Sequence, residues 1–183
     1  MVFALMIRTI GHSTRSFSTF VELLRDSEIS ELIDVRTIPR SRRHPHFNRE
    51  TLSASLRDFG IGYAHMPGLG GLRHARPDSI NTGWRNASFR GYADYMQTPT
   101  FEQNLAMLIE HARRGQVAIM CAEAVPWRCH RSLIADALVA REVTVEHIVG
   151  LGRREPHRMT SFARLDGTRV TYPGPGPEQL SSA

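Results

Sequence analysis

Short apolar runs alternate along this chain with longer segments in which apolar residues recur every three or four positions. The runs have the length of buried strands and lie at residues 4–10, 31–35, 61–65, 117–121 and 143–149. The segments with helical spacing or helix caps begin near Phe17, Asn48, Thr98 and Cys129. This alternation predicts an α/β fold in which a mainly parallel sheet carries helices on both faces. Residues 66–88 show no clear period and are expected to form a long loop.

At 183 residues the chain suits a single domain with an ordinary hydrophobic core. We expect the domain to span residues 1–150, followed by an extension at residues 151–183 that is basic and then rich in proline and glycine. Within the extension, Asp166-Gly167 predicts the turn of a small hairpin. Residues from Pro173 onward are typical of a loose tail.

The charged residues and the cysteines limit the chemistry and the cellular location that we expect for this chain. The net charge is +5, and all 23 basic residues other than histidine are arginine, which excludes lysine Schiff-base chemistry. Guanidinium groups suit bidentate contact with phosphate or carboxylate, although codon bias in a GC-rich genome is the simpler reason for the missing lysines. The start of the chain lacks a secretory signal, and no apolar run approaches the roughly 20 residues of a membrane span. We therefore expect a soluble, cytoplasmic protein with reduced cysteines and no membrane partner.

Polar side chains follow three of the expected strands. His12 and Ser13 follow the first, Asp34 and Arg36 end the second, and Cys121 and Glu123 end the fourth. The carboxyl ends of parallel strands meet at one edge of a sheet, where open α/β proteins bind ligands. The sequence therefore predicts a polar pocket at this edge.

The segment from Val117 to Arg131 is the most informative part of this edge. An apolar strand leads into a turn and then into a helix start, where exposed N–H groups and the helix dipole favour an anion. The start of this helix carries Arg128, Cys129, His130 and Arg131, of which Arg128, His130 and Arg131 are further candidates for the pocket.

Three chemistries are open for these residues. Cys121 followed by Arg128 resembles the strand, cysteine loop and helix of cysteine-dependent phosphatases and sulfurtransferases, with Cys121 as nucleophile. The match is imperfect, because six residues separate the two and they include Glu123 but no glycine. Alternatively, Glu123 and Asp34 form a carboxylate pair for acid–base chemistry. In that case an anionic part of the substrate would be held by Arg36, Arg40, Arg128 and Arg131.

The third chemistry is a zinc site made by Cys121, Cys129, His130 and His12. Compact zinc sites favour cysteine pairs two to four residues apart, and this chain has none. We therefore expect no metal and no other cofactor. Residues 40–47, RSRRHPHF, form a basic stretch with an aromatic residue, which suits either contact with a phosphate backbone or an ordinary exposed loop.

Four motifs together resemble a family of conserved bacterial proteins known as domain of unknown function 488. They are G-H-S at residues 11–13, D-V-R-x-x-P at 34–39, L-G-G at 69–71 and C-x-E-x-x-P-x-x-C-H-R at 121–131. The resemblance covers about residues 7–148. It implies an α/β domain with a polar pocket made by these segments, and it supplies no activity, substrate or cofactor.

The sequence thus predicts an enzyme, a hydrolase or group transferase, that acts on an anionic, nucleotide or nucleic-acid-like substrate. The alternative is a non-catalytic module that binds nucleic acid or a phosphorylated ligand. The expected catalytic groups are Cys121, Glu123, Asp34 and His130. The expected anion-binding groups are His12, Ser13, Arg36, Arg40, Arg128 and Arg131. The sequence leaves the oligomeric state open.

Overall fold

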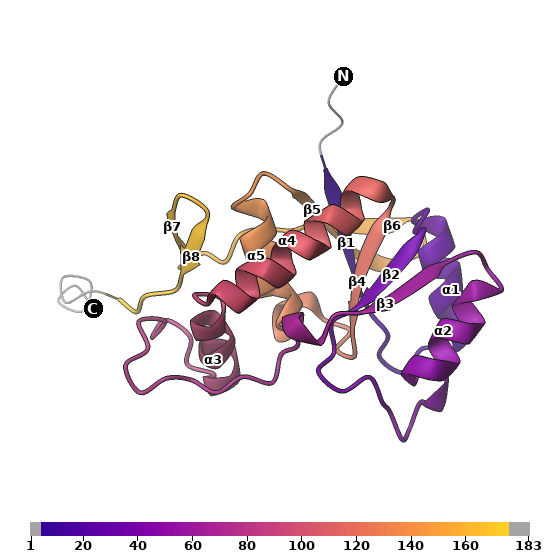
Figure 1. Cartoon of the computed structure of the whole chain (residues 1–183), viewed down its shortest axis with the longest axis horizontal. Helices are drawn as coiled ribbons and strands as arrows, with labels where there is room; N and C mark the ends of the chain where they lie inside the picture. The colour runs from indigo at the N-terminus through magenta and orange to yellow at the C-terminus, as the bar shows by residue number, and fades with distance from the viewer. Residues whose placement is uncertain (1–4, 176–183) are drawn as a thin grey trace.

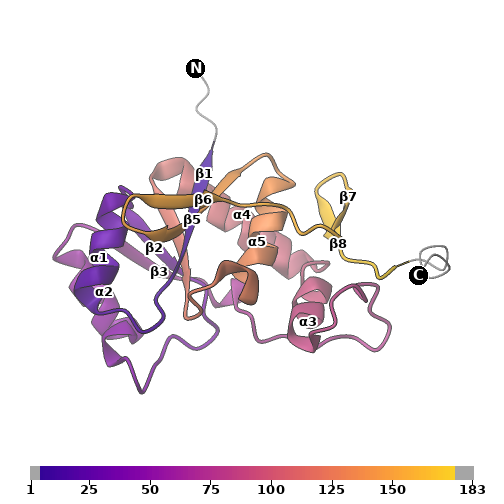
Figure 2. The same cartoon turned by 180° about the vertical axis from the view of Figure 1, so that it is seen from behind.

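The computed structural model describes residues 5–175, in which one six-stranded sheet lies between two layers of helices (Figures 1 and 2). The strand order is β3-β2-β4-β1-β5-β6, and only the edge strand β6 runs antiparallel to its neighbour. The strands are β1 Met6–Gly11, β2 Glu31–Asp34, β3 Gly62–His65, β4 Val117–Cys121, β5 Thr144–Gly150 and β6 Arg153–Pro156. This confirms the predicted α/β fold with a mainly parallel sheet.

The helices are α1 Phe17–Asp26, α2 Arg49–Arg57, α3 Ala87–Tyr95, α4 Pro99–Arg114 and α5 Arg131–Val139. Three short 3-10 turns join them to the strands, η1 Pro45–Phe47, η2 Pro67–Leu69 and η3 Pro126–Arg128. The hydroxyl of Thr98 accepts a hydrogen bond from the amide of Phe101, and Pro99 occupies the first turn. Helix α4 therefore begins where its cap predicts.

Each face of the sheet has its own core. In β4, Val117 and Ile119 face the layer of α3, α4 and α5, whereas Ala118 and Met120 face α1 and α2. This alternation follows from the two-residue period of a strand. Both faces are apolar because helices cover both, as the two views of the cartoon show (Figures 1 and 2).

Residues after Gly150 pack onto the domain, although their composition is typical of a loose extension. Strand β6 completes the sheet, and the hairpin of β7 Arg164–Asp166 and β8 Arg169–Thr171 turns at Gly167, as predicted. Tyr172 is fully buried, and its hydroxyl donates a hydrogen bond to Asp136 of α5 at 2.8 Å. The expectation that the compact part ends with the fifth strand is therefore wrong, because these buried groups extend it.

Two further differences concern element boundaries. Helix α3 begins at Ala87, inside the stretch expected to be a loop, and Asn86 caps it by accepting from the amides of Ser88 and Phe89. Most of the expected tail, residues 176–183, lies outside the described residues. Within residues 5–175, no helix is both long enough and apolar enough to cross a bilayer.

Candidate functional site

A cavity of about 570 Å³ opens at the carboxyl edge of the sheet, where the adjacent strands β2, β4 and β1 end. Its walls come from these strand ends, from residues 36–41, from Gly71 and Leu72, from the start of α3 and from the turn before α5. Seven of the predicted site residues line it, namely His12, Arg36, Arg40, Cys121, Glu123, Arg128 and His130. The convergence expected from the parallel topology therefore occurs.

Asp34 does not line the cavity, because it is fully buried behind Arg36. The Nε of Arg36 lies 2.9 Å from Oδ1 of Asp34, and its Nη2 lies 2.6 Å from Oδ2. The hydroxyl of Tyr63 also donates to Oδ2 at 2.7 Å. With both oxygens occupied, Asp34 is placed as the counter-ion of Arg36 and not as the acid or base that the sequence suggested.

Arg36 and His12 meet at the floor of the cavity. The Nδ1 of His12 donates to the carbonyl of Ser13 at 2.9 Å, so Nε2 is the acceptor that faces Nη1 of Arg36 at 3.3 Å. Burial, together with the nearby Arg36 cation, lowers the pKa of His12 from 6.5 to about 4. His12 is therefore neutral at neutral pH. Its ring stacks on that of Phe47, with the centroids 4.3 Å apart.

This stacking changes the interpretation of residues 40–47. Phe47 is fully buried, so the aromatic residue of the basic stretch belongs to the core and is not offered to a ligand. Arg42 and Arg43 remain exposed and line a neighbouring hollow of about 480 Å³. Ser13 lies in this hollow and not in the main cavity.

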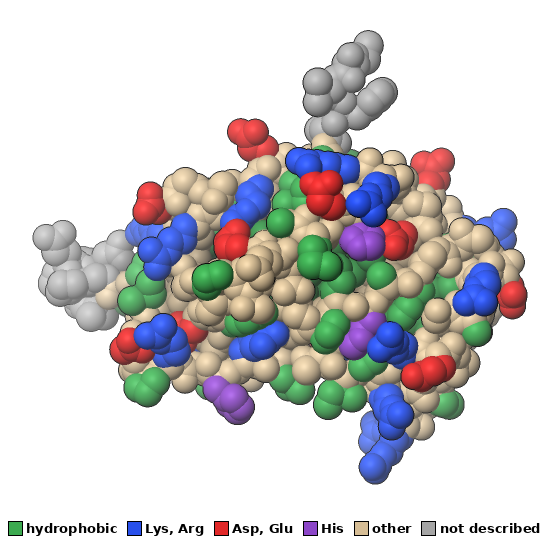
Figure 3. Space-filling view, in the orientation of Figure 1, with side chains coloured by type: hydrophobic (Ala, Val, Ile, Leu, Met, Phe, Trp, Pro, Cys, Tyr) green, Lys and Arg blue, Asp and Glu red, His purple; other side chains and the backbone are tan. Residues whose placement is uncertain are grey.

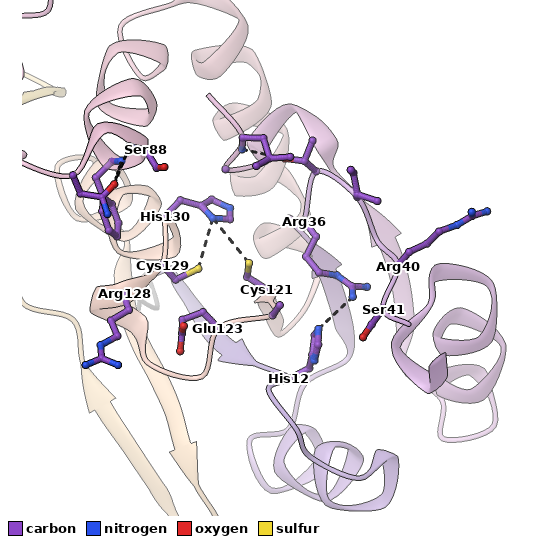
Figure 4. A pocket seen from close by; sticks show the side chains of 17 residues that line it. His12, Arg36, Arg40, Ser41, Ser88, Cys121, Glu123, Arg128, Cys129 and His130 are labelled. Atoms are coloured by element: carbon purple, nitrogen blue, oxygen red, sulfur yellow. Dashed lines mark hydrogen bonds between the residues drawn. The ribbon is translucent and has the colours of Figure 1, made fainter. Parts of the chain in front are cut away.

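Cys121, Cys129 and His130 form a compact cluster in the wall of the cavity (Figure 4). The chain leaves β4 at Cys121 and is folded back by the η3 turn, which places Cys129 beside it. The Nδ1 of His130 lies 4.0 Å from the sulfur of Cys121 and 3.6 Å from that of Cys129. The Nε2 of the same ring lies 3.2 Å from the carbonyl of Val35, to which it donates.

The pKa values of the two neighbouring thiols are shifted in opposite directions. Proximity to the Cys121 thiol, together with the Arg131 cation, lowers the pKa of Cys129 well below its ordinary value. The same pairing, together with burial, raises the pKa of Cys121. Cys129 is only 4% exposed. The raised pKa does not favour Cys121 as an activated nucleophile.

Arg131 is fully buried and does not reach the cavity. Its guanidinium donates to the hydroxyl of Thr9 at 3.0 Å, to the carbonyl of Glu123 and to the sulfur of Cys129 at 3.4 Å. The contacts with Glu123 and Cys129 hold the turn between β4 and α5, and the contact with Thr9 ties this turn to β1. Arg131 is therefore a structural cation and not the anion-binding group that the sequence predicted.

Three charged side chains at the cavity are exposed, Arg40, Arg128 and Glu123. None of them forms an ion pair with a residue of 5–175. Arg40 and Arg128 flank the central groups from opposite sides (Figure 4). A carboxylate oxygen of Glu123 accepts from the amide of Val125 at 3.1 Å, which holds the side chain in the turn.

The sequence did not indicate the apolar wall of the cavity. Ile38 and Leu72 line it while 62% and 69% exposed, and Phe89 of α3 joins them. Gly71, noted only as part of a motif, has a steric role. A Cβ added there would lie 2.5 Å from Nδ1 of His130, so the backbone can approach the ring only at glycine.

Among the described residues, the ligand atoms of Cys121, Cys129 and His130 lie within 4.8 Å of one another and could hold a soft metal ion. His12, the fourth ligand of the hypothetical zinc site, is not part of this group because it faces Arg36.

A family model described as domain of unknown function DUF488 matches residues 16–138. This chain belongs to the DUF488 family. The matched residues contain three of the four motifs and every segment of the cavity wall except His12. No curated protein and no solved structure shows significant similarity to the chain.

Proposed function

We propose that this DUF488 protein is an enzyme that hydrolyses a nucleotide-like anionic substrate, or transfers a group from it, in the cavity at the carboxyl edge of the sheet. One observation carries the proposal: Arg40 and Arg128 flank the same cavity without acidic partners among residues 5–175, and an apolar wall lies beside them. A volume of about 570 Å³ suits a ligand of nucleotide size.

The arginines divide into two kinds. Arg40 and Arg128 are exposed and would bind phosphate oxygens through charge-assisted hydrogen bonds. Arg36 is held by Asp34 and directs only Nη1 toward the cavity floor, so it would act as a fixed donor. The wall of Ile38, Leu72 and Phe89 would contact the ring of a base.

Glu123 is the carboxylate available for proton transfer, because Asp34 is enclosed. It lies in the same turn as Arg128, so a substrate whose phosphate meets that arginine would place a neighbouring bond near the carboxylate. General acid or base catalysis of this kind contributes roughly 10²–10⁴-fold to the rate.

Binding is tested with nucleoside mono-, di- and triphosphates, inorganic phosphate and an uncharged nucleoside, by calorimetric titration. We expect a nucleotide to bind more tightly than phosphate or nucleoside alone. Arg128→Gln and Arg40→Gln should each weaken it about tenfold, which corresponds to about 1.4 kcal/mol. Arg57→Gln is the matched control, since this exposed arginine ends α2 at the opposite edge of the sheet. Equal affinities for all three variants would refute the proposed binding site.

Turnover is tested with Glu123→Gln on any nucleotide that the wild-type protein converts. We expect the rate to fall at least about 100-fold with unchanged affinity, because the amide cannot exchange a proton. An unchanged rate would remove Glu123 from the mechanism.

A non-catalytic nucleic-acid binder is the second candidate, and the exposed Arg42 and Arg43 beside the cavity favour it. Against it, Phe47 is buried, and basic and acidic side chains are interspersed on the face shown in Figure 3. A backbone binder should lose affinity log-linearly with salt. Absence of binding to labelled single-stranded or duplex oligonucleotides at low salt would exclude this function.

A further inference from the structure

The Cys121–Cys129–His130 cluster brings two sulfurs and one ring nitrogen together in the wall of the cavity. Its three ligand atoms belong to residues 121–130, yet they converge within 4.8 Å because η3 reverses the chain between the cysteines. Compact zinc sites usually have cysteines two to four residues apart in the sequence. Here the turn at η3 brings Cys121 and Cys129 together although they are eight positions apart.

The ring of His130 is oriented toward the two sulfurs. Its Nε2–H donates to the carbonyl of Val35, so the lone pair of the neutral ring is on Nδ1, between the sulfurs. A backbone carbonyl that fixes the tautomer in this way is typical of metal-bound histidine. Because residue 71 is glycine, the space beside Nδ1 of His130 stays open, whereas a Cβ on residue 71 would fill it.

Two of the three ligand distances are close to those around a tetrahedral ion. With bonds of about 2.3 Å to sulfur and about 2.0 Å to nitrogen, tetrahedral ligands lie roughly 3.5 Å apart for sulfur and nitrogen. The observed separations of 3.6 and 4.0 Å exceed this value by half an ångström or less. The two sulfurs lie within 4.8 Å of each other, so a rotation of the cysteine side chains would bring both to the same ion. Thiolate and imidazole together are the ligand set of zinc and similar soft ions.

We infer that Cys121, Cys129 and His130 bind one zinc-class divalent ion whose fourth position opens into the cavity. All three residues line the cavity, so water or an anion in it can reach the ion. Three protein ligands with an open position characterise catalytic zinc sites, whereas structural sites are closed by a fourth ligand. In this assignment the Cys121 sulfur is a metal ligand and not a nucleophile. The inference does not depend on the proposed function, because metal binding is measured without substrate.

The first test is a titration of the reduced, tag-free protein with Zn²⁺ and, separately, with Co²⁺. We expect one equivalent of Zn²⁺ bound more tightly than about 1 μM. Co²⁺ should give a thiolate-to-metal charge-transfer band in the near ultraviolet and the visible bands of a tetrahedral site. Failure to bind Zn²⁺, or a cobalt spectrum without thiolate bands, would overturn the inference.

Variants locate the ion. Cys121→Ser, Cys129→Ser and His130→Gln should each weaken Zn²⁺ binding at least about 100-fold. Two histidines outside the cluster serve as controls: His12 lines the same cavity and His74 is exposed. The variants His12→Gln and His74→Gln should each bind Zn²⁺ as tightly as the wild-type protein. Retained binding by the double variant Cys121→Ser/Cys129→Ser would refute the site. If a variant does not fold, the thiolate intensity of the wild-type cobalt spectrum still decides whether two sulfurs bind.

Oxidation provides an independent test. Zn²⁺ should protect both cysteines of the wild-type protein from alkylation and from disulfide formation in air. A reduced protein that binds no Zn²⁺ but forms the Cys121–Cys129 disulfide would show a dithiol redox pair instead. That result would contradict the metal site while leaving the proposed anion-binding cavity intact.

Discussion

Asp34 and Arg36 form a two-point ion pair at the end of β2, with the carboxylate fully buried and the Arg36 residue 5% exposed. The pair holds the long Arg36 side chain in one position, because its Nε and Nη2 are hydrogen-bonded to Asp34. Only Nη1 faces His12. The D-V-R motif therefore encodes a rigid donor at the cavity floor and not two independent groups.

Removal of Asp34 should leave this cation buried without a partner. We expect Asp34→Asn to lower the free energy of unfolding by about 3–5 kcal/mol, measured by urea denaturation. Asp78→Asn is the control, because the Arg76–Asp78 pair is exposed to solvent and its loss should leave the free energy of unfolding almost unchanged. Similar losses in the two variants would contradict the role given to the buried pair.

Gly71 should tolerate no side chain beside the cysteine cluster. In Gly71→Ala the new Cβ would lie 2.5 Å from Nδ1 of His130, so the ring must leave its present position beside the sulfurs. We expect Co²⁺ affinity to fall at least about tenfold while the protein stays folded. In Gly62→Ala the nearest atom would be 3.5 Å away, and this control should bind Co²⁺ normally. Wild-type affinity in Gly71→Ala would show that the close approach has no functional role.

His147 should make the protein sensitive to acid. Burial, with help from His157 and Arg131, lowers the pKa of His147 from 6.5 to about 4. The unfolded chain therefore takes up a proton that the folded protein excludes, and stability is full above pH 6.5 and falls as the pH drops toward 4. The loss is on the order of 2 kcal/mol. Unfolding measured across this range should show a shallower pH slope in His147→Gln than in wild type, and parallel slopes would contradict the assignment.

Tyr172 should show that the residues after Gly150 stabilise the domain. It is fully buried and bonded to Asp136, so Tyr172→Ala should cost about 3–5 kcal/mol of unfolding free energy. Leu165→Ala, at a side chain 54% exposed in the same hairpin, should change stability by less than about 1 kcal/mol. A small effect of Tyr172→Ala would mean that the hairpin is dispensable.

The sheet could be predicted from the sequence because buried parallel strands are continuous apolar runs, as in residues 117–120. The parallel topology then determines which loops meet, so the convergence of His12, Arg36 and Cys121 required no side-chain information. Helix α3 also has a detectable signal, since Phe89, Tyr92, Ala93 and Met96 follow the Asn86 cap at helical spacing.

The direction of individual side chains could not be predicted. Nothing in the spacing shows that Arg131 turns inward to Thr9 whereas Arg128, three residues earlier, stays exposed. The reversal at η3, which joins Cys129 to Cys121, depends on one short turn after Val125. Tyr172 is buried through contacts with residues distant in the sequence, such as Asp136, so the composition around Tyr172 does not predict its burial.

The most direct test of the cavity as the binding site is a titration of the isotope-labelled protein with the tightest-binding nucleotide, followed by amide chemical shifts. We expect the shifts to gather on the cavity segments, residues 36–41, 71–72, 86–89 and 121–130. Shifts confined to the neighbouring hollow around Ser13, Arg42 and Arg43, or scattered over the surface, would contradict it.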